Sequence, residues 1–211
     1  MSSNRLRVLL VSMLAVFAVS AVASASASAA NHEYFVEGVA LGATETVSGT
    51  SAVSKLEAPG LITIECATDS FTGTIEPKGL STATVKFKTC TVVGAATCKV
   101  AEPIEFTANN KLTVLLNEAN VFGPGDLFEP PTGKEFVTIT ITGCALEGKY
   151  VAEGKQQCIL PAGETELVKH EIECKPKGSE IHLKAKEAKF TSTETVELSG
   201  AKKGQKWHVK L

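Results

Sequence analysis

The stretch Val137-Thr138-Ile139-Thr140-Ile141-Thr142 shows most clearly how this chain folds. Apolar side chains alternate with threonines, and every position carries a β-branched residue. Alternation with a period of two places the valine and both isoleucines on one face of a β-strand and the threonines on the other. We therefore predict a strand over residues 137–142 whose apolar face packs against a core.

The same pattern recurs on both sides of this strand. Residues 82–88 alternate in the same way, and residues 61–66 form an apolar segment after the Pro59-Gly60 turn. Glycine and proline separate such segments at the spacing typical of sandwiches and barrels. We predict an all-β chain, an antiparallel β-sandwich or barrel-like fold, with further strands near 35–41, 98–106, 111–116, 145–152, 165–174, 179–185, 190–198 and 205–210.

Residues 123–133 interrupt this pattern with the run Gly-Pro-Gly-Asp-Leu-Phe-Glu-Pro-Pro-Thr-Gly. Such a density of glycine and proline predicts irregular backbone. The segment could join two small sub-domains, or it could be a long loop over a single sandwich. As a binding loop it would offer Asp126, Phe128 and Glu129, but we favour an ordinary connector.

Residues 1–30 have the three parts of a cleavable secretory signal peptide, which we expect to be helical. Arg5 and Arg7 supply a basic start, an apolar stretch follows over residues 8–23, and small residues complete the segment. The Ala27-Ser28-Ala29 triplet fits the pattern that signal peptidase accepts, so we expect cleavage after Ala29 or Ala30. The apolar run is shorter than the roughly 20 residues of a membrane span, and no later segment is apolar for longer. We expect residues 31–211 to form an extracellular or cell-wall-associated domain without a transmembrane span.

The composition argues against several kinds of partner. Residues 31–211 contain no arginine, and the net charge of −2 becomes −4 when Arg5 and Arg7 are removed. A mildly acidic chain without arginine is a poor match for nucleic acid. Trp207 is the only tryptophan and Tyr34 and Tyr150 are the only tyrosines, so aromatic platforms for sugars are scarce.

The cysteine count predicts disulfides. An even number of cysteines in an exported chain indicates a disulfide framework rather than a metal site, and no short metal-binding spacing is present. A hairpin turning at Gly94 would bring Cys90 and Cys98 together. We expect the pairs Cys90–Cys98, Cys158–Cys174 and Cys66–Cys144, and we expect no cofactor or metal.

No nucleophile motif stands out in the chain. A G-x-S-x-G elbow is absent. His170 and His182 could approach each other from adjacent strands, but a lone strand histidine is more often a surface or satisfied residue. Glu164 with Glu166, and Glu171 with Glu173, would each lie on one face of a strand. Such glutamate pairs more often form a solvated charged face than the catalytic carboxylate pair of a glycoside hydrolase.

Several cysteine-containing strands resemble a large group of uncharacterised exported, β-rich proteins from actinobacteria, in which an I-x-C strand precedes an F-T-G-C strand. The resemblance covers the signal and most of the remaining chain, and its motifs here are Ile64-Glu65-Cys66, Phe87-Lys88-Thr89-Cys90, Thr97-Cys98, Ile141-Thr142-Gly143-Cys144 and Gly204-Gln205-Lys206-Trp207. Lys88-Thr89 lacks the glycine of the common form. The resemblance implies a β fold, export and disulfides, and it implies no activity, substrate or cofactor.

The leading functional expectation is a secreted or cell-surface, non-catalytic β domain with a structural or interaction role. One alternative is a carbohydrate- or small-ligand-binding module that uses a sheet face or residues 123–133. A further alternative is a secreted hydrolase, which needs His170 or His182 beside a serine or glutamate in a pocket. A cell-envelope component or a glycan is the expected kind of partner.

Overall fold

The structure is a computed structural model that describes residues 32–117, 119–175 and 177–211. The expected signal peptide, with Ala29 and Ala30, lies outside the described residues. His32–Leu211 forms one compact unit. The regular elements of the described residues are strands and two short 3-10 helices, so the all-β antiparallel prediction is confirmed.

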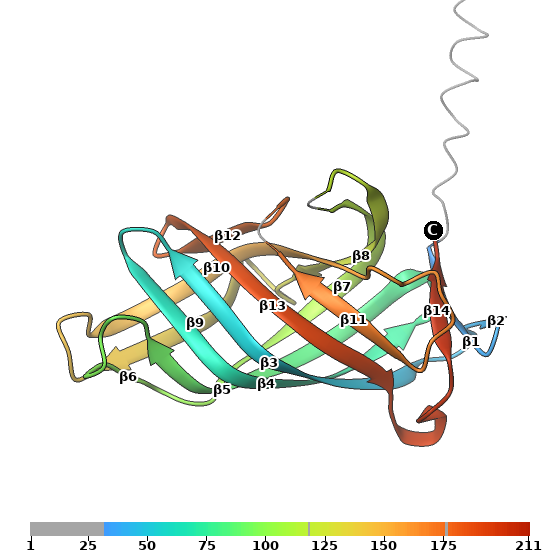
Figure 1. Cartoon of the computed structure of the whole chain (residues 1–211), viewed down its shortest axis with the longest axis horizontal. Helices are drawn as coiled ribbons and strands as arrows, with labels where there is room; N and C mark the ends of the chain where they lie inside the picture. The colour runs from blue at the N-terminus through green and yellow to red at the C-terminus, as the bar shows by residue number, and fades with distance from the viewer. Residues whose placement is uncertain (1–31, 118, 176) are drawn as a thin grey trace, which may run out of the picture. The chain divides into compact units, whose positions relative to one another are not determined.

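The strands vary widely in length, and the longest ones form the body of the unit (Figure 1). In chain order the elements are β1 (Glu33–Val36), β2 (Val39–Ala40), β3 (Glu45–Ala58), β4 (Ile62–Glu76), η1 (Pro77–Gly79), β5 (Leu80–Val92), β6 (Lys99–Val100), β7 (Ile104–Leu116), β8 (Phe122–Glu129), β9 (Glu135–Thr142), β10 (Gly148–Ile159), β11 (Lys169–Cys174), β12 (Glu180–Leu183), β13 (Lys186–Leu198), η2 (Gly200–Lys202) and β14 (Trp207–Lys210). None of the helices among the described residues is long and apolar enough to cross a membrane.

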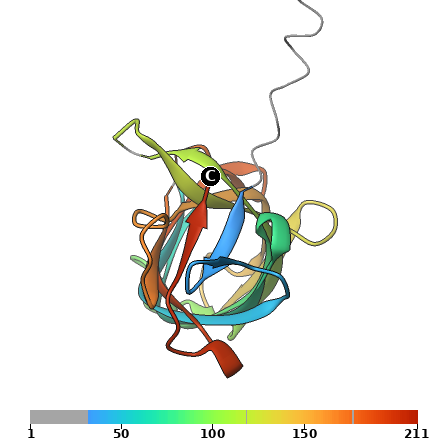
Figure 2. The same ribbon diagram turned by 90° about the vertical axis from the view of Figure 1, so that its right-hand side faces the viewer.

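The large sheet of 11 strands closes on itself. Its neighbours follow the order β11-β13-β3-β4-β5-β7-β8-β10, and β10 then pairs with β11 to complete a ring. Figure 2 shows this ring of strands end-on. Of the two predicted forms, the barrel-like one is therefore correct.

The strand β10 changes neighbours along its length. Residues 148–153 pair with β9 and residues 152–155 with β12, whereas residues 156–159 pair with β8. Gly154 lies at this change, with a positive φ of 118°, and a Cβ there would collide with the carbonyl oxygen of Glu180. Only glycine allows β12 to come this close.

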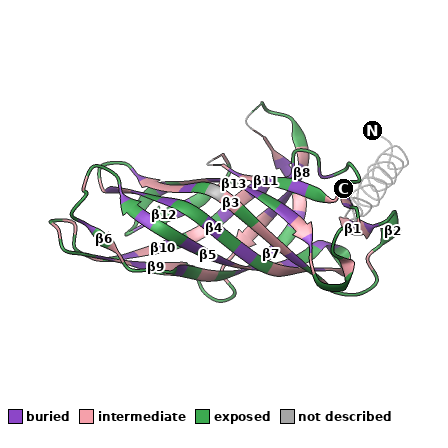
Figure 3. Cartoon of the chain, turned by 60° about the horizontal axis from the view of Figure 1, so that its bottom comes forward, coloured by how far each residue is buried: buried purple, intermediate pink, exposed green. Residues whose placement is uncertain are grey.

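Alternating side chains fill the interior of the ring. Buried and exposed positions alternate along the strands (Figure 3). Ile139 and Ile141 of the alternating 137–142 segment are buried, and Val137 is half-buried. The predicted apolar face thus packs inside the closed sheet.

A second sheet, of three strands in the order β14-β1-β2, covers one end of the ring (Figure 2). Tyr34 and Trp207 of this cap sheet are buried. The Tyr34 hydroxyl donates a hydrogen bond to Asp126 Oδ1 at 3.2 Å, and His170 Nε2 lies 2.7 Å from the carbonyl oxygen of Trp207. These contacts connect the cap sheet to β8 and β11.

The disulfides differ in part from the prediction. The pairs are Cys66–Cys90, Cys98–Cys144 and Cys158–Cys174. The Cys158–Cys174 prediction is confirmed, whereas Cys90–Cys98 and Cys66–Cys144 were wrong. The reason is strand register: Cys66 stands opposite Cys90 in the β4–β5 ladder, so β5 does not turn back to bring Cys98 to Cys90. Pairing of β6 with β9 brings Cys98 to Cys144 instead.

The prediction of an irregular connector over 123–133 is wrong for residues 123–129, whereas residues 130–133 lack regular structure. Residues 122–129 form β8, which pairs with both β7 and β10 inside the large sheet. Gly125 is required by close packing, because a Cβ there would lie 2.6 Å from the carbonyl oxygen of Cys158. The glycine that suggested a loop is the residue that lets three strands approach one another.

Candidate functional site

The closed sheet encloses an apolar cavity of about 90 Å³. Its wall is built by inward side chains from most strands of the ring. Five phenylalanines line it, and they come from five different strands: Phe87, Phe106, Phe128, Phe136 and Phe190. A cavity lined in this way offers a ligand dispersion contacts and almost no hydrogen bonds.

One part of the cavity wall is closed by side chains rather than by backbone pairing. In the described residues β7 and β9 lie next to each other without a ladder between them. Phe106 of β7 and Phe136 of β9 meet edge to face there, with ring centroids 5.4 Å apart. Phe136 is the extra residue of a β-bulge opposite β10, which turns its ring toward the seam.

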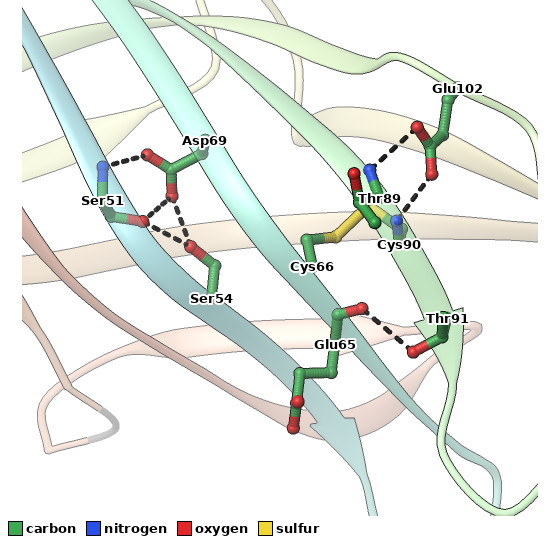
Figure 4. Close-up of a disulfide and its surroundings, with 9 residues drawn as sticks. All are labelled: Ser51, Ser54, Glu65, Cys66, Asp69, Thr89, Cys90, Thr91 and Glu102. Atoms are coloured by element: carbon green, nitrogen blue, oxygen red, sulfur yellow. Dashed lines mark hydrogen bonds between the residues drawn. A yellow bond between two sulfur atoms is a disulfide. The ribbon is translucent and has the colours of Figure 1, made fainter.

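A polar cluster lies beside the same cavity, which Ser54 and Glu194 line. Figure 4 shows Asp69 of this cluster with Ser51 and Ser54. The carboxylate of Asp69 accepts hydrogen bonds from the hydroxyls of Ser51 and Ser54 and from the backbone N–H of Ser51. Ser192 donates to Glu194 Oε1 at 3.2 Å. Asp69 and Glu194 are both buried, so two acidic side chains share one desolvated region.

Burial changes the protonation of the interior acids. Desolvation, with a smaller contribution from the charge of Asp69, raises the pKa of Glu194 to about 8, and the Ser192 hydrogen bond opposes this only in part. Desolvation also raises the pKa of Asp126 to about 6, against the hydrogen bond from Tyr34. Glu194 therefore holds its proton at neutral pH.

A smaller void of about 30 Å³ lies between this cavity and the cap sheet. Tyr34, Asp126 and Trp207 contribute to its wall. The two voids adjoin, because both are lined by Val85, Phe128 and Glu194.

A wide groove on the outer surface is a second candidate site. It has a volume of about 990 Å³ and is lined by charged residues of both signs, among them Lys55, Glu65 and Lys177. Lys55 is ion-paired with Glu57 at 2.8 Å, and both side chains are exposed. Solvated ion pairs of this kind contribute little binding energy, so the interior is the stronger candidate.

The two histidines and the two glutamate pairs considered in the sequence analysis do not form a catalytic group. His170 is buried against Trp207, whereas His182 is exposed on another strand. Within the described ranges, no histidine makes a hydrogen bond to a serine or glutamate side chain. The paired glutamates face outward, and Glu173 forms an ion pair with Lys175.

The aromatic residues considered for sugar binding are inside the protein. Trp207 and Tyr150 are both buried, and the Tyr150 hydroxyl donates to the carbonyl oxygen of Leu146 at 2.8 Å. Neither ring can serve as a surface platform for a sugar.

Sequence reasoning named Asp126 but missed the buried acids Asp69 and Glu194, although a signal for Glu194 was present. Glu194 has the same strand parity as Phe190, Val196 and Leu198, which all point inward. Strand parity therefore places this carboxyl on the inward face, although glutamate side chains are usually exposed.

The fold and the site together define a disulfide-bonded, closed antiparallel sheet with an apolar cavity and a smaller adjoining void inside it. Comparisons with known protein families, curated proteins and solved structures found no match to this chain. The geometry of the interior is therefore the main evidence on function.

Proposed function

We propose that this protein is an exported, non-catalytic binding protein that encloses a small, largely apolar ligand within its closed sheet. The observation that carries the proposal is the apolar cavity of about 90 Å³. This is the small-ligand form of the binding-module alternative, with the ligand inside the sheet rather than on its face.

The energetic cost of the cavity supports binding. At about 24 cal/mol per Å³, an empty cavity of about 90 Å³ destabilises the fold by about 2 kcal/mol. That is a sizeable part of the roughly 5–15 kcal/mol by which domains are usually stable. A ligand that fills the cavity removes this cost and stabilises the folded state by mass action.

The cavity limits the size of the ligand. An engineered apolar cavity of about 150 Å³ accepts benzene or xenon. A cavity of about 90 Å³ fits a smaller hydrocarbon group, of roughly four carbons by this comparison. The seam between Phe106 and Phe136 offers an entrance, because ring rotation there breaks no backbone hydrogen bond.

The cellular location is part of the proposal. Three disulfides fit an oxidising, extracellular type of environment. The basic and apolar start of the chain and the resemblance to exported actinobacterial proteins support secretion through a cleaved signal peptide.

Methyl NMR of the protein, purified after expression of the full-length gene in an exporting host, tests the proposal. Xenon should give saturable shifts at the methyl groups of Val85, Ile139 and Ala152, which line the cavity. Ala152→Val should weaken xenon binding by roughly tenfold by filling the cavity. Ala58→Val, at an equally buried alanine that does not line the cavity, is the matched control and should leave binding unchanged. The absence of saturable shifts in the wild-type protein would rule the proposal out.

An interaction role is a second candidate, favoured by the β7–β8 hairpin. This hairpin projects from the closed sheet (Figure 1). Phe122 and Val121 near its tip are 72% and 58% exposed. An exposed apolar tip is typical of contact surfaces. Phe122→Ser should reduce binding of the protein to the envelope fraction of the producing cell, and unchanged binding would contradict this role.

A further inference from the structure

The small void beneath the cap sheet contains unpartnered polar atoms. Ser81 Oγ, Asn110 Oδ1 and Trp207 Nε1 are buried and have no hydrogen-bond partner among the described residues. The three side chains are 7%, 7% and 1% exposed, and all of them line the void of about 30 Å³. Leaving a buried donor or acceptor unpaired costs about 1–3 kcal/mol each, so these atoms require a ligand or water.

The small void, called the polar void below, adjoins the apolar cavity. Val85, Phe128 and Glu194 line both of them. A molecule in the larger cavity can therefore place one end beside Ser81, Asn110 and Trp207 while its remaining atoms contact the phenylalanines.

We propose that the enclosed ligand is a small alcohol, whose hydrocarbon part occupies the apolar cavity and whose hydroxyl lies in the polar void. This inference rests on the proposed binding function and names its ligand class. The hydroxyl accepts a hydrogen bond from Trp207 Nε1–H and donates one to Asn110 Oδ1.

Other head groups match these atoms less well. An ammonium group has no acceptor for the Trp207 N–H, and an ether has no donor for the Asn110 oxygen. A hydrocarbon leaves all three atoms unpaired. A carboxylate would lie beside the buried acids Asp126 and Glu194, which repel it when they are ionised.

Four probes of equal heavy-atom number separate these cases: 1-butanol, methyl propyl ether, n-butylammonium and n-pentane. Burial raises the pKa of Asp126 to about 6 and the pKa of Glu194 to about 8. Both acids are therefore protonated at about pH 5. Ionic attraction therefore does not favour the ammonium probe. Trp207 is the only tryptophan, so its indole N–H resonance reports on the polar void alone.

We expect 1-butanol to bind at least roughly tenfold more tightly than the other three probes and to shift the indole N–H resonance. Binding of n-pentane without this preference for butanol would overturn the inference and leave the proposed function standing. Butanol that binds without moving the indole resonance would also overturn it, because water alone would then satisfy the polar void. Failure of all four probes to bind would overturn both.

Two matched variants test the assigned atoms. Asn110→Leu removes the inward amide, whereas Asn109→Leu makes the same change at the exposed neighbouring position of β7. Asn110→Leu should lower the butanol affinity to that of n-pentane, and Asn109→Leu should behave as the wild type. Asn110→Ala provides the same test in case Asn110→Leu fails to fold. Full butanol preference in folded Asn110→Leu or Asn110→Ala would contradict the assignment.

Discussion

Replacement of Glu194 by glutamine should change how the stability of the protein depends on pH. The carboxyl group is buried, and its pKa rises from an ordinary value of 4.5 to about 8 on folding. The folded state therefore binds this proton more tightly than the unfolded state does. Between these two pKa values the free energy of unfolding falls as the pH rises, and the penalty is complete above about pH 8.

The magnitude follows from the shift. Each pKa unit corresponds to about 1.4 kcal/mol, so a rise from 4.5 to about 8 sets a ceiling of about 5 kcal/mol. Water penetration and relaxation lower this ceiling to a few kcal/mol. Glutamine at position 194 does not titrate, so the Glu194→Gln variant should lack this part of the slope.

Urea unfolding followed by the fluorescence of Trp207, between about pH 5 and about pH 9, measures the effect. We expect the stability of Glu194→Gln relative to the wild type to increase from about pH 5 to about pH 8 and to level off above that. Glu187→Gln, at an exposed position on the same strand, is the matched control and should follow the wild type. Parallel curves for the wild type and Glu194→Gln would refute the argument that this carboxyl is buried and protonated.

Three further predictions concern contacts that hold the fold together. Tyr34→Phe removes the hydrogen bond to Asp126. In urea unfolding, the free energy of unfolding should fall by about 1–3 kcal/mol above about pH 6. The fall should be smaller at lower pH, where Asp126 is protonated. An equal loss at all pH values would contradict the role of Asp126. A double alanine variant without the Cys98–Cys144 disulfide opens a loop with a sequence separation of 46. Its free energy of unfolding in guanidinium should fall by about 4 kcal/mol, and a fall of less than about 1 kcal/mol would contradict this prediction. The Glu102 carboxylate accepts hydrogen bonds from the backbone N–H groups of Thr89 and Cys90 at 2.9 and 2.6 Å (Figure 4). Glu102→Ala should therefore destabilise the protein by about 1–2 kcal/mol in thermal unfolding. An unchanged melting temperature would show that water replaces the carboxylate.

Strand alternation predicted the class of fold correctly because it reports which side chains share a face. The 137–142 segment is a strand with Ile139 and Ile141 buried, as its period of two indicates. Alternation does not report the curvature of a sheet, so it could not separate a sandwich from a closed ring. Closure depends on the pairing of β10 with β11. The predicted Cys158–Cys174 disulfide implied this contact, but it did not show that the contact completes a ring.

The wrong disulfide pairs and the wrong loop have a common cause. Both predictions assumed that nearby cysteines and glycines mark local turns. Cys90 instead pairs across the β4–β5 ladder, and Gly125 makes room for a neighbouring strand. Such long-range contacts decide these features, and the local sequence is compatible with either outcome.

The apolar cavity could be predicted only in part. Inward parity identified Val137 and Ile139 as core residues, and both line the cavity. Whether inward side chains fill a closed sheet completely depends on their combined volumes and rotamers, which a single strand does not reveal.

Xenon-pressurised crystals of the purified protein test most directly whether the closed sheet binds apolar ligands. We predict a single strong xenon peak inside the ring of strands, in contact with Phe87, Ile139 and Ala152. We predict that this peak is much weaker in Ala152→Val and is unchanged in Ala58→Val. A crystal structure without interior xenon, or with these side chains packed so closely that no cavity remains, would contradict the proposed function.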